Sequence, residues 1–174
     1  MTKVANDVRW LASGPRCGLG EISIPSLQPG SSIMPGKVNP VIPEAVLMVG
    51  AQVVGNDAAI TWGGAAGNFE LNVMMPMIAH NLLQSIEILG NAADVFAGRC
   101  IEGIEANRER AEQMVEQSLA MVTVLAPRIG YDDAASIAKE SVKTGRTVRE
   151  IAKEREVLPL DELEELLDPR SQTE

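Results

Sequence analysis

The most apolar run of the chain reads AVLMVGAQVV, residues 45–54, and it opens a long segment that carries almost no charge. Between positions 45 and 98 the only formally charged side chains are those of Asp57, Glu70, Glu87 and Asp94. A helix that is apolar on nearly all sides is normally buried in a large core or in an interface between chains. The segment therefore predicts long helices that need further helices packed around them.

This charge-poor segment divides into two predicted helices. The first starts after Pro43 and fades at Gly63, and the second begins near Asn68 and continues to about Phe96. Pro76 then falls within the first two turns of the second helix, where it costs little or bends the helix. Such a pair predicts a bundle that other subunits complete.

The remainder of the chain, from residue 99, is strongly charged and predicts a set of short amphipathic helices. We expect them at residues 107–116, 118–126, 132–143, 148–153 and 161–167. Asp132 and Thr147 are the expected N-caps, because short oxygen-bearing side chains accept hydrogen bonds from the first free N–H groups of a helix. Residues 21–24 are the one short candidate for a strand, so the predicted fold class is all-α.

Composition excludes several classes of function. The formal net charge is −9 and no basic cluster is present, which argues against nucleic acid as a partner. Residues 45–54 are too few to span a bilayer, so no membrane is expected, and the N-terminus lacks the apolar region of a secretory signal. Cys17 and Cys100 are far apart and predict neither a zinc site nor a disulfide framework. We therefore expect a cytoplasmic protein.

A loop of mixed chemistry, GSSIMPGKVNP at residues 30–40, comes directly before the first long helix. Its two prolines and two glycines do not suit a helix interior. It offers two hydroxyls, one ammonium and one carboxamide near a helix N-terminus, where the partial charge is positive. These groups suit a small carboxylated substrate. They belong to Ser31, Ser32, Lys37 and Asn39, and Glu44 follows in the first turn of the helix.

Other interpretations of these residues fit the sequence less well. The spacing of Gly30 and Gly36 is wrong for a phosphate-binding loop, and no Gly-x-Ser-x-Gly surrounds Ser31. A serine-rich loop can also be an ordinary solvated turn, and Glu44 can simply compensate the helix dipole. His80, the only histidine, lies among apolar residues and is expected to be a hydrogen-bonded core residue.

The loop also resembles a family signature, Gly-Ser-x-x-Met-Pro-x-Lys-x-Asn, at residues 30–39. Residues 5–16 (ANDVRWLASGPR), 67–72 (GNFELN) and 129–132 (IGYD) are similar to further motifs of class II fumarases. The chain thus resembles the fumarase/aspartase superfamily along its whole length. The resemblance implies part of a central helical bundle at about residues 1–104, with a mobile serine loop at about 21–40. It also implies a small helical C-terminal domain at about residues 105–174.

Function and site residues follow from the same resemblance. The family adds water reversibly to fumarate to give (S)-malate, without a metal or an organic cofactor. By resemblance Ser31 is the catalytic serine that removes a proton from carbon. Ser32, Lys37 and Asn39 match substrate-binding positions, with Val38 between them in the binding strip. Glu44 matches the carboxylate that orients the catalytic histidine of the family.

The resemblance also implies that half of a site is present. The family's histidine lies in a Gly-x-Thr-His segment upstream of the signature, and this sequence has no such segment. Family members associate as homotetramers in which three chains build each site. We therefore expect fumarate or malate, a separate N-terminal portion and further copies as partners, and almost no activity from these residues alone. An aspartate ammonia-lyase of the same superfamily and a non-catalytic interaction fragment are the alternatives.

Overall fold

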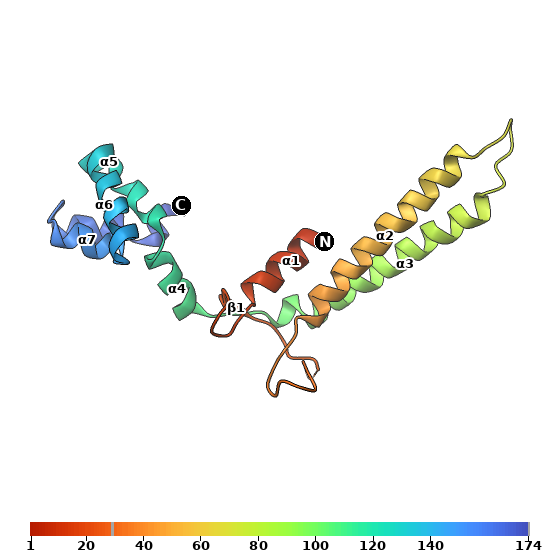
Figure 1. Ribbon diagram of the computed structural model, residues 1–174, viewed down its shortest axis with the longest axis horizontal. Helices are drawn as coiled ribbons and strands as arrows, with labels where there is room; N and C mark the ends of the chain where they lie inside the picture. The colour runs from red at the N-terminus through yellow and green to blue at the C-terminus, as the bar shows by residue number, and fades with distance from the viewer. Residues whose placement is uncertain (29, 174) are drawn as a thin grey trace. The chain divides into compact units, whose positions relative to one another are not determined.

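The computed structural model describes residues 1–28 and 30–173, and most of them are helical, which confirms the predicted fold class (Figure 1). The chain divides into two compact units, Met1–Asn107 and Arg108–Glu174. The expected division into domains at residues 104 and 105 stays a prediction. No helix within the described residues is both long and apolar enough to cross a membrane.

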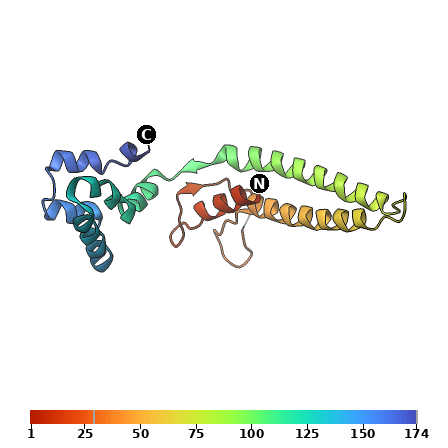
Figure 2. The same cartoon turned by 90° about the horizontal axis from the view of Figure 1, so that it is seen from above.

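The first unit is built on a long antiparallel helix pair, α2 (Val41–Ala65) and α3 (Met75–Arg99). The two helices run side by side along their whole length in both ribbon views (Figures 1 and 2). The shorter α1 (Thr2–Leu11) packs against α2. The predicted pair of long helices is therefore confirmed.

The core of this unit lies where α1 meets the start of α2 and the end of α3. Its buried side chains are Ala5, Val8, Val46, Phe96 and Cys100. Burial raises the pKa of the Cys100 thiol above its ordinary value, because a charged thiolate is poorly solvated there. At the same end of the unit, β1 (Ile22–Ser23) pairs antiparallel with β2 (Glu105–Ala106), next to the 3₁₀-helix η1 (Ile101–Gly103). The short strand candidate at residues 21–24 is confirmed.

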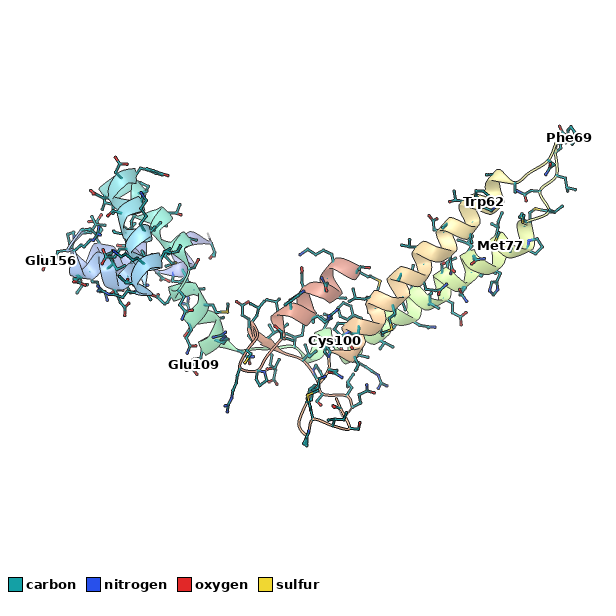
Figure 3. The ribbon with its side chains drawn as sticks, viewed as in Figure 1. Trp62, Phe69, Met77, Cys100, Glu109 and Glu156 are labelled. Carbon is teal, nitrogen blue, oxygen red and sulfur yellow. The ribbon has the colours of Figure 1, made fainter. Side chains whose placement is uncertain are left out.

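The junction between the long helices is longer than predicted, because α3 begins at Met75 and not near Asn68. Asn72 explains the difference: its Nδ2 donates to the Gly63 carbonyl at 2.9 Å, and its Oδ1 accepts from the Met74 amide at 2.8 Å. Phe69, labelled in Figure 3, has a positive φ of 53°, which breaks the helical path. Pro76 then takes a place in the first turn, where no donor is needed.

A polar cluster crosses the middle of the helix pair. The Asn56 side chain, only 3% exposed, donates to Gln84 Oε1 and to Ser85 Oγ, each at 3.0 Å. Its own oxygen accepts from Gln52 Nε2 at 2.9 Å. These bonds satisfy the buried amide and fix one register between α2 and α3.

The second unit is a compact group of short helices. Their bounds are α4 (Arg108–Glu116), η2 (Leu119–Val124), α5 (Ala126–Ile129), α6 (Tyr131–Thr144), α7 (Val148–Glu154), α8 (Leu160–Leu166) and η3 (Pro169–Gln172). They enclose a core of eight buried residues, Met121, Leu125, Ile137, Val148, Ile151, Ala152, Leu163 and Leu167. The helix expected at 118–126 is a 3₁₀-helix followed by the separate α5.

The two cap predictions for this unit have different outcomes. Thr147 caps α7 in a full capping box, in which its side chain accepts from the Glu150 amide and the Glu150 carboxylate accepts from the Thr147 amide. The prediction for Asp132 is wrong, because α6 already begins at Tyr131 after Gly130, which has a φ of 89°. Asp132 instead lies in the first turn, where its charge favours the helix dipole.

One arginine joins three parts of the second unit. Arg149 donates to both carboxylate oxygens of Glu116, to Glu164 and to the Leu167 carbonyl. The hydrogen bond to Glu116 raises the pKa of Arg149 above its ordinary value. Glu164 also pairs with Lys153, and this contact, with that to Arg149, lowers the pKa of the Glu164 carboxyl.

Candidate active site

The loop before α2 is closed by two hydrogen bonds at Gly30. The Gly30 amide donates to the Lys37 carbonyl at 2.9 Å, and Asn39 Nδ2 donates to the Gly30 carbonyl at 2.6 Å. A Cβ atom at Gly30 would lie 2.1 Å from the Lys37 oxygen, so only glycine allows this approach. Residues 30–39 therefore form a closed loop, whereas position 29 of the expected loop at 21–40 lies outside the described residues.

Ser31 has a defined environment inside the closed loop. Its Oγ accepts hydrogen bonds from the amides of Ile33, at 3.1 Å, and Met34, at 3.0 Å. Two backbone donors stabilise negative charge on an oxygen, as in an oxyanion hole. The Ile33 and Met34 amides therefore hold the Ser31 oxygen in one position and point two donors at it.

Lys37, Val38 and Asn39 line a cavity of about 460 Å³ in the first unit. Several residues between positions 12 and 26, among them Ser23 and Ser26, also line it, together with Asn107. The polar lining groups are one ammonium, two hydroxyls and two carboxamides, from Lys37, Ser23, Ser26, Asn39 and Asn107. Among the described residues no acidic side chain lines the cavity, so it suits a small anion.

The structure does not bring all the predicted site residues to this cavity. Ser31, Ser32 and Glu44 are not among its lining residues. Ser32 is exposed, while Glu44 is half-buried in the first turn of α2, whose N-terminus has no side-chain cap. The positive end of the α2 dipole follows Asn39 in the chain.

Sequence reasoning missed the contribution of Asn107 and Ser23. Asn107 lies more than eighty positions from Gly20 and Ser23, yet it bonds to both. No motif contains these residues, and only the pairing of β1 with β2 brings them together. Within the described part of the chain no three His, Cys, Asp or Glu side chains are grouped as metal ligands.

Comparison with known proteins places this loop in a family. Residues 1–55 match the lyase family model, and residues 121–174 match the model of the fumarase C C-terminus. The chain is 53% identical over 172 residues to a fumarate hydratase class II of Mycobacterium tuberculosis. It is 60% identical over 152 residues to that of Bordetella parapertussis. The chain belongs to the class II fumarase family.

The match covers the C-terminal portion of class II fumarases. The chain spans about a third of the related proteins: 97% of it aligns with 36% of the Mycobacterium tuberculosis protein, and 87% with 33% of the Bordetella protein. Solved structures agree. A class II fumarase of Schistosoma mansoni superposes with a TM-score of 0.89 at 41% identity, covering 97% of this chain and 35% of that one. A fumarate lyase:delta crystallin of Brucella melitensis superposes with a TM-score of 0.94 at 48% identity, and the match covers 99% of this chain and 37% of that one.

Proposed function

We propose that this chain carries the serine-loop part of a fumarate hydratase site, which converts fumarate and water reversibly to (S)-malate. The observation that carries the proposal is the closed loop, in which two amides bond to Ser31 Oγ while Lys37 and Asn39 line one cavity. Relatives that are 53–60% identical and named fumarate hydratase class II support this activity over the ammonia-lyase alternative.

The proposed chemistry is easiest to follow from malate to fumarate. Ser31, as an alkoxide held by the Ile33 and Met34 amides, takes a proton from the carbon next to one carboxylate. The electron pair left on that carbon moves into the carboxylate and gives a dianion, which the Lys37 ammonium and the Asn39 carboxamide stabilise. The dianion then expels the hydroxyl group, which leaves as water with a proton donated by an acid from outside these residues, and fumarate results.

The other site residues take supporting roles in this proposal. Ser32 and Val38 complete the binding strip beside Lys37, and both are exposed and free to meet a substrate. Glu44 orients a histidine from a segment outside these residues, on the logic by which one group positions the next. The bundle domain at about 1–104 and the small domain at about 105–174 are part of the same proposal.

The proposal also includes partners and location. Many apolar side chains of α2 and α3 are exposed, among them Trp62 and Leu83, and a homotetramer that builds each site from several chains would cover them. A cytoplasmic location is supported by Cys17 and Cys100, two free cysteines that a reducing compartment keeps unpaired.

The test replaces Ser31 in a complete enzyme. This chain is fused behind the remaining N-terminal part of the Mycobacterium tuberculosis relative, and loss of fumarate is followed spectroscopically. Ser31→Ala should lower kcat by about 100-fold or more, since it removes the general base. Ser171→Ala, an equal change in the second unit, is the control and should leave kcat unchanged.

Three results would contradict the proposal. Turnover that is unaffected by Ser31→Ala would remove the serine from the chemistry. Ammonia release from aspartate, with malate unreactive, would favour the ammonia-lyase alternative. A fusion that assembles and yet shows no turnover would favour the non-catalytic interaction fragment.

A further inference from the structure

Asn107 makes three hydrogen bonds to the first residues of the serine loop. Its Nδ2 donates to the Gly20 carbonyl at 2.8 Å, and its Oδ1 accepts from Ser23 Oγ at 3.0 Å. Its backbone amide donates to the Glu21 carbonyl at 2.8 Å. One residue at the end of β2 therefore holds the whole entry of the loop, residues 20–23.

Neighbouring contacts make this anchor rigid. Ile22 and Ser23 pair with Ala106 and Glu105 in the two-stranded sheet. Three positions after Ile22, the Pro25 ring lies against η1, so closely that a Cβ atom at Gly103 would come within 2.4 Å of it. The entry of the loop is thus fixed to the segment that follows α3, and Asn107 is its side-chain connection.

The anchor and the reactive loop meet at one cavity. Asn107 and Ser23 line the same cavity of about 460 Å³ as Lys37 and Asn39. Residues 30–39 are already a closed unit, because Gly30 is bonded to both Lys37 and Asn39. A closed unit moves as a body, so its position depends on its two attachments: the start of α2 and the anchored entry at residues 20–23.

We propose that Asn107 is a positioning residue for the Ser31 loop, and this inference rests on the proposed function. Asn107 bonds to the entry of the loop and not to Ser31, and it acts by holding residues 20–23 so that the closed unit stays over the cavity. Asparagine suits the role because its carboxamide donates and accepts at once. Aspartate at this position keeps the oxygen that accepts from Ser23 Oγ. It replaces the donating Nδ2 with a second oxygen, which repels the Gly20 carbonyl.

The experiment compares Asn107→Asp and Asn107→Ala with the milder Ser23→Ala, all in the fusion enzyme described above. Gln113→Glu is the matched control, since it makes the same amide-to-carboxylate change on the exposed surface of α4. Two quantities are measured: kcat/KM for fumarate, and hydrogen exchange of the backbone amides at positions 21 and 107, which are hydrogen-bonded at the entry of the loop, relative to the amides around Phe96 in the core.

Both Asn107 variants should lower kcat/KM about tenfold or more, because small misplacement of a reacting group is costly. They should speed exchange of the amides at positions 21 and 107 about tenfold while the core amides stay unchanged. Ser23→Ala should give a smaller effect, and none on top of Asn107→Ala, because it removes one of the same bonds. A merely structural role would speed exchange in the core as well, and the control should change neither quantity.

The inference is overturned if the Asn107 variants leave exchange of the amides at positions 21 and 107 equal to that of the control, or if exchange rises equally in the core. Failure of the proposed function has a different result. In that case Ser31→Ala leaves turnover unchanged, or turnover is absent, while the Asn107 variants still speed exchange at positions 21 and 107 selectively.

Discussion

At the scale of single residues, Gly30 is a position where the loop leaves no room for a side chain. Any larger residue places its Cβ atom 2.1 Å from the Lys37 carbonyl and must open the loop. Gly30→Ala should therefore lower kcat/KM of the fusion enzyme about 100-fold, because the loop loses its closed geometry. Gly90→Ala, where an added Cβ meets nothing within 4 Å, is the control for hydrogen exchange at residues 30–39. Equal exchange in the two variants would refute the closed-loop argument.

Glu164 leads to a prediction on pH. Its ion pairs with Lys153 and Arg149 hold its pKa in the folded chain below the ordinary value of 4.5. A lowered pKa stabilises the fold above the unfolded pKa, and this stabilisation is lost as the pH falls through the folded value. The effect is small, because the side chain is largely exposed to screening solvent.

Unfolding midpoints between pH 7 and pH 3 test this directly. The difference between the wild-type chain and Glu164→Gln should be greatest above pH 4.5 and should shrink on acidification below it. Glu165→Gln is the control: this neighbouring carboxylate makes no ion pair within the described residues, so the variant should follow the wild-type curve. A constant difference across the range would show that the ion pairs do not act through protonation of Glu164.

At the scale of elements, patterns within the chain predicted the helices better than their ends. The charge-poor segment predicted the long helix pair, and Thr147 predicted the start of α7, because each feature can be recognised from residues that are close in the sequence. The start of α3 was misplaced, since Asn72 bonds back to Gly63 and no periodicity reveals such a contact. Asp132 was misplaced as a cap because Gly130 already serves at that position.

The candidate site also has one part that the sequence could predict and one part that it could not. The loop at residues 30–40 could be found because its reactive groups lie together in the sequence. The bonds from Asn107 to Gly20 and Ser23 could not, because they cross more than eighty positions and depend on the pairing of β1 with β2. Long-range contacts of this kind need the fold before they can be recognised.

The contact between α2 and α3 depends on the polar cluster at Asn56. Asn56→Ala should destabilise the chain by about 1–3 kcal/mol, because it removes the amide that bonds to Gln52, Gln84 and Ser85 between the two helices. Urea unfolding measures this difference. Asn91→Ala, at an exposed position on α3, should change stability by less than about 0.5 kcal/mol. A loss at Asn56 no larger than that at Asn91 would show that the cluster does not hold the pair together.

At the scale of the whole molecule, the surroundings of His80 show which helix faces need other helices to cover them. The expectation of a core histidine is wrong for this chain, because the residue is exposed on α3. Its apolar surroundings are exposed as well, with Leu83 at 65% and Ile86 at 60%. The pattern that suggested a core therefore marks helices whose outer faces have no cover within these residues.

The last prediction is that the chain does not exist as a soluble monomer at micromolar concentration. The exposed apolar side chains of the long pair, including Met48, Val54, Trp62 and Leu83, make association favourable. Sedimentation velocity should show species well above the monomer mass of 18.6 kDa. Leu83→Glu should shift the distribution toward the monomer, because a charge costs free energy when it is buried in an interface. Tyr131→Glu, at an equally exposed aromatic of the second unit, should leave it unchanged. A stable wild-type monomer would contradict both this prediction and the proposed tetramer.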